Sequence, residues 1–515
     1  MITVTKQSLM SLLAGMLIDP TMIEEIQVKG ISLDSRTVEA GGLYLLLAHD
    51  NSQRLSYLKQ AISSGVVVVL YDQEQDLNSD EILVLAKANI AAYAVRNLAD
   101  KAGEIAARFY GHPSLALTII AVTGTNGKTS VSQFIAQSLE SLAMPCGVVG
   151  TLGTGRINTL SMTGMTTPDP ITLQAILADF CHQGIQYAVI EASSHALEQG
   201  RLNSIDIDVA VLTNLSRDHL DYHNSMEEYS AAKARLFNFA SVKTAILNRD
   251  DNFGQSLLTK LVAMGGKKVW AYSQNNKQAN FFANNCQVTP LGIEFELISG
   301  WGNHTIKSPL LGLFNIDNLL AAIASLIAIN IPFEKVCGAI EQCASVNGRM
   351  QVYGGDQQVQ IVVDFAHTPD AISKALQALR NHITEQGKLW CVFGCGGDRD
   401  VGKRAEMGHS AECYADKVVL TDDNPRSEDP ANIISDILKG ITAPQKVHIE
   451  HNRKLAIAYA ISQASVGDII LVAGKGHEEF QEIAGVKQHF SDAECIKDIL
   501  ASNDINNFRM RVGAR

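Results

Sequence analysis

Short apolar runs rich in β-branched residues alternate with segments of helical periodicity along nearly all of this 515-residue chain. Such alternation is typical of parallel sheets whose strands are joined by helices. The sequence therefore predicts an α/β fold. A helix is expected at 53–63, and strands are expected at residues 43–47, 65–71, 117–123, 146–150, 188–191, 208–213, 245–247, 361–364, 389–394, 417–421, 447–450 and 469–473.

The chain is too long for one hydrophobic core, because single cores stop growing at roughly 250–300 residues. The expected strands fall into three groups, and the turn Val346–Arg349 stands before the last group. We therefore predict three domains, comprising residues 1–90, 91–346 and 347–515.

Acidic residues outnumber basic ones, with 54 Asp and Glu against 42 Lys and Arg and a formal net charge of −12. Nonspecific binding to nucleic acid or to an anionic membrane needs basic surface. We therefore expect no nucleic acid and no membrane among the partners. The nine cysteines are scattered, which argues against a disulfide framework and favours a reducing cytoplasm.

Two apolar stretches bear on export and membrane insertion. Residues 10–18 are followed by Asp19 and Pro20 and lack the small-residue pattern of a signal cleavage site. Residues 319–331 are interrupted by Ser325 and Asn330 and are shorter than the roughly 20 residues that span a bilayer. We interpret the first stretch as the first helix of the fold and the second as a core helix.

The stretch A-V-T-G-T-N-G-K-T-S, residues 121–130, follows an expected buried strand and opens an expected helix. Gly124 and Gly127 let backbone N–H groups converge on phosphate oxygens there, and the helix N-terminus adds positive potential. Lys128 is expected to reach the terminal phosphates and Thr129 to bind Mg²⁺. Val122 replaces the first glycine of the strict motif, so a glycine-rich turn with an exposed lysine is the competing interpretation. We favour a nucleoside triphosphate as the ligand.

Two further strands deliver polar side chains at their carboxyl ends, where α/β sheets bind ligands. Glu191 ends one strand and is placed to ligate the Mg²⁺ that Thr129 touches. The other strand leads into a loop dense in His and Asp, in which we favour His219 as a second-metal ligand and His223 as structural. Zinc is the alternative metal, although no cysteine lies nearby. A solvated carboxylate is the competing interpretation of Glu191, and a surface lysine that of Lys233.

A longer series of motifs resembles the Mur ligase family of ATP-dependent amide-forming enzymes. The series, in order, is TGTNGKT at 123–129, EASSHAL at 191–197, TNLSRDHLDYH at 213–223, AAK at 231–233, NGR at 347–349, DFAHTPDA at 364–371, GGDRD at 396–400, DNPR at 423–426 and GKGHE at 474–478. It covers essentially the whole chain. The pattern is most similar to that of the family member that adds the third residue of the peptidoglycan stem peptide.

The resemblance implies a ligase that uses ATP and Mg²⁺ and acts on UDP-N-acetylmuramoyl-L-alanyl-D-glutamate. The γ-carboxylate of the D-glutamate is phosphorylated, and the amine of the incoming amino acid attacks the acyl phosphate. Phosphorylation is needed because a carboxylate is a poor electrophile, and Mg²⁺ offsets the charge of the phosphoryl group. The resemblance further implies a UDP-binding α/β domain, a central P-loop ATPase-type domain and a C-terminal Rossmann-like domain, in a cytoplasmic monomer.

The resemblance also assigns residues. The expected catalytic residues are Lys128, Lys233 and His219, and the expected metal ligands are Thr129, Glu191, His219 and Lys233 as its carbamate. Residues expected to bind ATP are Gly124, Thr125, Asn126, Gly127, Lys128, Thr129, Ser130, Asn315, Asn318, Arg349, Asp364 and His367. Residues expected to bind the UDP-muramoyl dipeptide are Leu33, Ser35, His49, Asp50, Asn51, Thr166, Thr167, Ser193, Gln199 and Arg201. Met165 stands where the family usually has asparagine.

The third domain is expected to select the amino acid, through Arg399, Asp423, Asn424, Pro425, Arg426, Gly474 and Glu478. These residues follow expected strand ends and can converge on one crevice. For meso-diaminopimelate, Arg426 can grip the distal carboxylate while Glu478 accepts from the distal ammonium. Lysine lacks that carboxylate and would leave Arg426 unpaired, so the sequence favours diaminopimelate over an L-lysine-adding enzyme.

Two other functions remain as alternatives. A ligase similar to folylpolyglutamate synthase shares the phosphate loop, but it should lack DNPR and GKGHE, and both are present here. A nucleotide-binding switch would give no reason for Arg399, Arg426 and Glu478 to follow strand ends in a separate domain.

Overall fold

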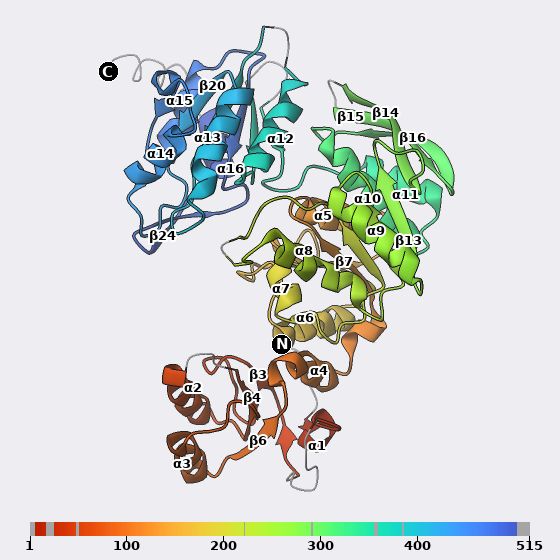
Figure 1. Ribbon diagram of the computed structural model, residues 1–515, viewed down its shortest axis with the longest axis vertical. Helices are drawn as coiled ribbons and strands as arrows, with labels where there is room; N and C mark the ends of the chain where they lie inside the picture. The colour runs from red at the N-terminus through yellow and green to blue at the C-terminus, as the bar shows by residue number, and fades with distance from the viewer. Residues whose placement is uncertain are drawn as a thin grey trace. The chain divides into compact units, whose positions relative to one another are not determined.

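The computed structural model describes residues 6–16, 25–47, 51–220, 222–289, 292–354, 359–383 and 386–501. Their strands form sheets of four, ten and six strands and two small two-stranded sheets. The three larger sheets are rich in parallel pairs, and helices alternate with their strands (Figure 1). The predicted α/β class is confirmed.

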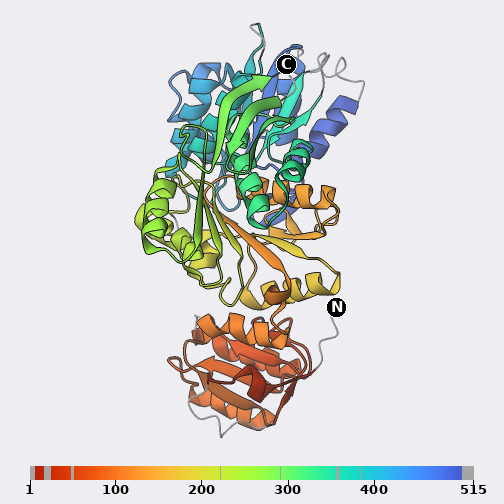
Figure 2. The same cartoon turned by 90° about the vertical axis from the view of Figure 1, so that its right-hand side faces the viewer.

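The first sheet is parallel, in the order β3 (Ile31–Ser32), β4 (Leu43–Leu46), β5 (Val68–Asp72) and β6 (Ala91–Val95). It lies between helices (Figure 2), with α2 (Asn51–Ser63) and α3 (Ser79–Ala88) packed on one face and α1 (Leu9–Leu12) and α4 (Leu98–Phe109) on the other. All four residues of β4 are buried because alternate side chains enter two cores. A short antiparallel pair, β1 (Gln7–Ser8) and β2 (Gln27–Val28), precedes the sheet.

The expected strands 43–47 and 65–71 and the helix 53–63 correspond to β4, β5 and α2. The first helix, expected at 10–18, is wrong in its bounds, because α1 ends at Leu12 and a turn with Gly15 at φ 74° follows. Residues 17 and 18 lie outside the described residues.

The central sheet has the strand order β16-β15-β14-β13-β12-β11-β7-β10-β8-β9. Its strands are β7 (Thr118–Thr123), β8 (Cys146–Gly150), β9 (Gly153–Gly155), β10 (Tyr187–Glu191), β11 (Val209–Leu212), β12 (Thr244–Asn248), β13 (Lys268–Ser273), β14 (Phe281–Thr289), β15 (Gly292–Ser299) and β16 (Gly302–Ser308). Its helices are α5 (Lys128–Ser141), α6 (Pro170–His182), α7 (Ser194–Glu198), α8 (Met226–Ala234), α9 (Asn252–Met264), α10 (Phe314–Ala328) and α11 (Phe333–Glu341).

All five strands expected in this region are present, as β7, β8, β10, β11 and β12. The antiparallel meander β14-β15-β16 was missed. Its strands alternate buried and exposed residues and carry many polar side chains, so they lack the continuous apolar runs on which the prediction relied.

The third sheet has the order β17-β18-β22-β19-β20-β21 and is parallel except for its edge strand β17. Its strands are β17 (Gln351–Tyr353), β18 (Gln360–Asp364), β19 (Leu389–Phe393), β20 (Lys417–Leu420), β21 (His448–Ile449) and β22 (Ile469–Ala473). Its helices are α12 (Pro369–Arg380), α13 (Gly402–Tyr414), α14 (Pro430–Leu438), α15 (Arg453–Gln463) and α16 (Asp492–Ala501). All five expected strands are present, and a core lies on each face of the sheet.

The chain divides into two compact units. One comprises residues 1–123, 143–210 and 232–244, and the other comprises residues 124–142, 211–231 and 245–515. The division passes through β11, α8 and β12, and elsewhere lies between elements, after residues 123 and 142. The predicted domain boundaries at 90/91 and 346/347 stay predictions.

The apolar stretch 319–331 lies mostly in α10, whose side chains are almost all buried, as expected of a core helix. Ser325 donates to the carbonyl of Ala321 at 2.7 Å and so satisfies its hydroxyl within the helix. Within the described ranges, no helix has the length and apolarity needed to cross a membrane. All nine cysteines are free, as the sequence predicts.

Candidate functional site

The phosphate loop occupies residues 124–127, between β7 and α5. Gly124 has φ 146° and Gly127 has φ 86°, conformations that side chains disfavour. A Cβ atom on Gly124 would overlap Thr213 Oγ1, and one on Gly127 would lie 2.6 Å from Asn318 Oδ1. Only glycine fits either position, so the backbone of the loop lies close to its neighbours; the predicted convergence of its N–H groups on a phosphate stays a prediction.

The loop after β11 braces the phosphate loop. Asn214 Oδ1 accepts from Asn126 N at 3.0 Å, and Asn214 O accepts from Thr125 N at 2.9 Å. Lys128 Nζ bends back to donate to the carbonyls of Gly124 (2.8 Å) and Thr125 (2.9 Å). The lysine therefore lies over the loop, where an anionic phosphate could exchange for these carbonyl acceptors.

Several residues expected to bind ATP lie around this loop within the same unit. Arg349 Nη2 lies 3.4 Å from Thr129 Oγ1, and its guanidinium stacks 4.5 Å from the ring centroid of Phe365. Asn318 Nδ2 donates to Asn315 Oδ1 at 2.9 Å. The structure thus brings the phosphate loop, the start of α10 and the Arg349 turn together.

The other two expected ATP-binding side chains are Asp364, the last residue of β18, and His367, in the segment that follows. Asp364 accepts from Met350 N at 2.8 Å, and burial raises the pKa of its carboxyl. His367 Nδ1 lies 2.8 Å from the carbonyl oxygen of Phe365, and burial lowers its pKa. Both side chains are held by backbone groups at the carboxyl edge of the sheet, as expected of ligand-binding positions.

The expected second-metal residue His219 has φ 54°, and its side chain is 41% exposed. Its Nε2 lies 3.5 Å from Asp218 Oδ2. Burial raises the pKa of Asp218, but the charges of His219, His367 and Lys403 lower it more, so the net pKa is below its usual value. His223 is buried against the ring of Tyr229, with centroids 5.2 Å apart, which supports its structural interpretation.

Glu191 is fully buried at the end of β10, so the competing interpretation as a solvated carboxylate is wrong. Its Oε1 accepts from Thr151 N and its Oε2 from Thr151 Oγ1, both at 3.0 Å. Thr151 was missed by sequence reasoning. The sequence feature that could have identified Thr151 is its position directly after Gly150, at the carboxyl end of β8, which pairs with the strand that carries Glu191.

The residues expected to bind the muramoyl dipeptide form one connected network with Glu191. Thr166 Oγ1 lies 3.2 Å from Thr151 Oγ1, and Thr167 Oγ1 donates to the carbonyl of Glu191 at 2.6 Å. The remaining members join through Thr167: Ser193 N donates to its Oγ1, Arg201 Nη1 donates to its carbonyl, and Gln199 Oε1 accepts from Arg201.

Met165, the departure from the family pattern, lies at the edge of this network. Its sulfur lies 3.6 Å from Arg201 Nη1. A thioether is a weak acceptor, so Arg201 relies chiefly on the Thr167 carbonyl at 2.7 Å.

Lys233 is buried, with 1% of its surface exposed, so its interpretation as a surface lysine is wrong. Burying an ammonium is costly unless it is paired or modified.

The four expected metal ligands are divided between the two compact units. Thr129 and His219 belong to one unit, whereas Glu191 and Lys233 belong to the other.

The residues between 33 and 51 that are expected to bind the UDP-muramoyl dipeptide can be described only in part. Ser35 Oγ donates to Gln60 Oε1 at 2.8 Å, and Leu33 packs against the core of the first sheet. His49 and Asp50 lie outside the described residues. Asn51 is the first residue of α2, and only its backbone is described.

The residues expected to bind diaminopimelate lie on loops after β19, β20 and β22, which are joined by hydrogen bonds. Gly397 N donates to the carbonyl of Asn424 at 2.9 Å, and Arg426 Nη1 donates to the carbonyl of Gly397 at 2.7 Å. Arg426 also exchanges backbone hydrogen bonds with the hairpin of β23 (Phe480–Ile483) and β24 (Val486–His489). We call these joined segments, residues 396–400, 423–428 and 474–486, the loop framework.

Two acidic side chains shape the electrostatics of the loop framework. Asp423 is buried with its Oδ2 against Gly474, where a Cβ atom would overlap it; burial raises its pKa, although Lys475 and Arg453 lower it. Glu482 Oε2 lies 3.8 Å from Arg426 Nε. Arg399 is exposed, and Pro425 precedes Arg426, whose φ is 52°.

Sequence reasoning missed Arg404, which is 1% exposed and connects parts of the loop framework. Its guanidinium donates to Glu428 (2.8 and 2.9 Å) and to the carbonyl of Gly396 (3.3 Å). Glu428 in turn accepts from Asp398 N. The signal was the cluster of charges following GGDRD.

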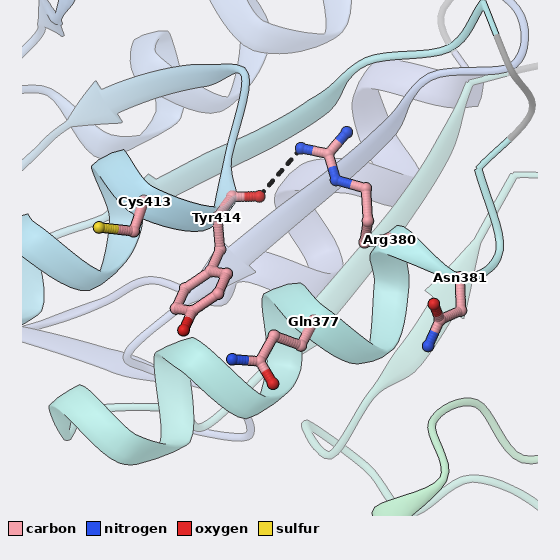
Figure 3. A pocket seen from close by; sticks show the side chains of 5 residues that line it. All are labelled: Gln377, Arg380, Asn381, Cys413 and Tyr414. Atoms are coloured by element: carbon pink, nitrogen blue, oxygen red, sulfur yellow. Dashed lines mark hydrogen bonds between the residues drawn. The ribbon is translucent and has the colours of Figure 1, made fainter.

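A cavity of about 370 Å³ lies elsewhere in the same unit, at the ends of α12 and α13 (Figure 3). Its lining residues are Gln377, Arg380, Asn381, Cys413 and Tyr414. Arg380 is held by Asp416 and by the carbonyl of Tyr414. None of the residues expected to bind ligands lines this cavity.

The donor types suit a phosphate ligand and a hard cation. The two glycines of the phosphate loop leave space that a Cβ would fill, and the Thr129 hydroxyl and the Glu191 carboxylate are oxygen donors of the kind Mg²⁺ prefers. Across the described ranges, no three His, Cys, Asp or Glu side chains cluster as a metal site. The zinc alternative would need such a cluster, so it gains no support.

Comparisons with known proteins identify the family. The Mur ligase middle domain matches residues 122–326, and the Mur ligase glutamate ligase domain matches residues 348–476. A Pseudomonas putida protein named UDP-N-acetylmuramoyl-L-alanyl-D-glutamate–2,6-diaminopimelate ligase is 43% identical over 480 residues, covering 92% of this chain and 95% of its own. This chain belongs to the Mur ligase family. A Coxiella burnetii Mur ligase of the same name is also 43% identical, over 92% of this chain and 96% of its own.

Solved Mur ligases share the fold. A structure of a UDP-N-acetylmuramoyl-L-alanyl-D-glutamate–2,6-diaminopimelate ligase is 37% identical, with a TM-score of 0.70 over 96% of this chain and 99% of its own. MurF from Acinetobacter baumannii is 18% identical, with a TM-score of 0.66 over 97% of this chain and all of its own. Folylpolyglutamate synthase from Mycobacterium tuberculosis, at 21% identity and a TM-score of 0.58, covers 72% of this chain and 91% of its own. The last two show a common fold alone.

Asp317, next to the expected ATP residue Asn318, carries a testable electrostatic feature. Its Oδ1 is shielded from solvent and has no hydrogen-bond partner among the described residues, and burial raises its pKa from 3.8 to about 7. The folded protein therefore binds the proton more tightly than the unfolded chain, and stability falls as pH rises from about 4 to about 7.

We predict that Asp317→Asn removes this loss. The change in the free energy of unfolding caused by the substitution, variant minus unmutated protein, should be more favourable at pH 8 than at pH 5 by roughly 2 kcal/mol. Urea unfolding at the two pH values measures the difference. The exposed Asp498, changed to Asn, serves as a control and should show no such pH dependence. An equal effect of Asp317→Asn at both pH values would contradict the buried-acid explanation.

Proposed function

We propose that this Mur ligase adds meso-diaminopimelate to the D-glutamate γ-carboxylate of UDP-N-acetylmuramoyl-L-alanyl-D-glutamate, with hydrolysis of ATP to ADP and phosphate. The observation that carries the proposal is 43% identity to a ligase of that name over 92% of the chain. The loop framework, with Arg426 and the acidic side chains around it, supports diaminopimelate as the amino acid, since that ligand has a carboxylate and an ammonium at its far end.

The proposed role of the phosphate loop is to hold the triphosphate. The backbone N–H groups of Gly127, Lys128 and Thr129, at the N-terminus of α5, would face the phosphates, because those of Thr125 and Asn126 already donate to Asn214. Lys128 would leave the loop carbonyls to reach the terminal phosphates. Asn315, Asn318, Arg349, Asp364 and His367 would hold the nucleoside.

The other groups act on the acid and the amine. Thr166, Thr167, Ser193, Gln199 and Arg201 would orient the glutamyl end of the UDP-linked substrate through their connected hydrogen bonds. Transfer of the terminal phosphoryl group to the γ-carboxylate gives an acyl phosphate, and the amine then displaces phosphate. Mg²⁺ would neutralise negative charge; the residues proposed as ligands are Thr129 and Glu191 for one ion, and His219 and carbamylated Lys233 for a second.

The direct test is ADP release in the presence of ATP, Mg²⁺ and the UDP-muramoyl dipeptide. We expect rapid release with meso-diaminopimelate, and much slower release with L-lysine or without an amino acid, because lysine lacks the distal carboxylate that Arg426 would bind. Turnover with L-lysine in preference to diaminopimelate would instead favour the lysine-adding alternative. Release that depends on a folate and glutamate would favour the folylpolyglutamate alternative.

A second prediction concerns Lys233. If its carbamate binds a metal, Lys233→Ala should lower activity by about 100-fold or more, because even the partners of metal ligands are worth about 10- to 100-fold. A small carboxylate such as acetate should restore part of the activity by occupying the space left behind. Lys268→Ala, at an exposed lysine of β13, is the control and should retain activity. Full activity of Lys233→Ala without added carboxylate would refute the carbamate.

A further inference from the structure

Lys475, in the loop after β22, is the lysine of the loop framework and is fully buried, with 0% of its surface exposed. A buried ammonium is costly unless its donors are satisfied and its charge is paired. Its Nζ lies 3.1 Å from Glu478 Oε2 and 3.3 Å from Asn424 Oδ1. Both partners are residues expected to bind the amino acid, whereas Lys475 has no assigned role.

The side chain of Asn424 is fixed by the same contacts. Its Oδ1 accepts from Lys475 Nζ and, at 2.9 Å, from Glu482 N, while its Nδ2 donates to Glu478 Oε2 at 2.8 Å. Both neighbours of Oδ1 are donors and the neighbour of Nδ2 is an acceptor, so only one orientation of the amide satisfies all three. Asn424, Lys475 and Glu478 therefore form a closed triangle of hydrogen bonds.

This triangle joins loops that the sheet alone does not bring together. Asn424 follows β20, and Lys475 and Glu478 follow β22, while β19 lies between these two strands. The buried Lys475 supplies two of the three hydrogen bonds of the triangle. Without the Lys475 ammonium, the Glu478 carboxylate would accept only from Asn424 Nδ2, and Asn424 Oδ1 would accept only from Glu482 N.

The triangle also decides which atom of Glu478 can meet a ligand. Both donors bind Oε2, and within the described residues no hydrogen bond reaches Oε1. The side chain of Glu478 is 24% exposed, whereas that of Lys475 is not exposed at all. The carboxylate can therefore offer Oε1 to a ligand while Lys475 binds Oε2.

We propose that Lys475 is a positioning residue for amino acid selection: it fixes Asn424 and Glu478 so that Glu478 Oε1 accepts from the distal ammonium of the incoming amino acid. Lys475 itself makes no contact with the amino acid, because its ammonium is enclosed. This inference rests on the proposed function, in which meso-diaminopimelate is that amino acid.

The test is Lys475→Met, which keeps most of the length of the side chain and removes the donors and the charge. We expect the KM for meso-diaminopimelate to rise by about 10- to 100-fold, the value of losing hydrogen bonds to a charged group. The KM values for ATP and for the UDP-muramoyl dipeptide should stay within about twofold, and kcat at saturating diaminopimelate should be largely retained.

A matched control is available in the same unit. Lys439 also donates to a carboxylate three residues away, Asp436, at 2.6 Å, but its side chain is 68% exposed. Lys439→Met should leave all three KM values unchanged, because an exposed pair of this kind contributes little.

The outcomes separate the alternatives. A lowered melting temperature of Lys475→Met with an unchanged KM for diaminopimelate would overturn the inference and leave Lys475 a purely structural residue. Equal rises in all three KM values would overturn it too. Should Lys475→Met fail to fold, Lys475→Gln decides, with the same expected rise in one KM. Absence of diaminopimelate-dependent ADP release in the unmutated protein would refute the proposed function, which is a different result from either of these.

Discussion

The backbone hydrogen bonds between loops at the carboxyl edge of the third sheet are the constraint on which the selection of an amino acid depends. Arg426 N donates to the carbonyl of Glu482 at 3.0 Å, Ala484 N donates to the carbonyl of Arg426 at 2.7 Å, and Gly397 N donates to that of Asn424. Loops that satisfy one another's backbone groups lose little further freedom when a ligand binds. The side chains of the loop framework are therefore held ready by the polypeptide itself.

Buried charged side chains also stabilise this framework. Each of them is paired with an opposite charge or forms several hydrogen bonds. Arg404 is bound by Glu428 and Asp436, and Arg453 forms a fully buried pair with Asp492 at 2.7 Å. Lys475 is the member whose partners are themselves expected to bind the ligand. The same principle operates in the other unit, where Thr151 satisfies both oxygens of Glu191.

The sequence predicted most of the parallel strands because continuous apolar runs mark strands that are buried on both faces, as in β4, β10 and β22. It missed the meander β14-β15-β16, in which polar and apolar residues alternate. The phosphate-loop glycines could be singled out from sequence because a positive φ is a local property of the backbone. Roles set by tertiary contacts could not be seen, which is why Thr151, Arg404 and Lys475 went unassigned and why Lys233 was assigned only through the resemblance.

The central claim is that the loop framework is formed before any ligand binds, and hydrogen exchange of the ligand-free protein tests it most directly. Mass spectrometry of peptides that cover residues 395–400, 423–428 and 480–486 reports the amides of Gly397, Arg426 and Ala484, which donate the joining hydrogen bonds. The account predicts slow exchange at these amides without ligand and little change when meso-diaminopimelate is added. Exchange at the rate of an unstructured peptide, with protection only after the amino acid binds, would contradict it.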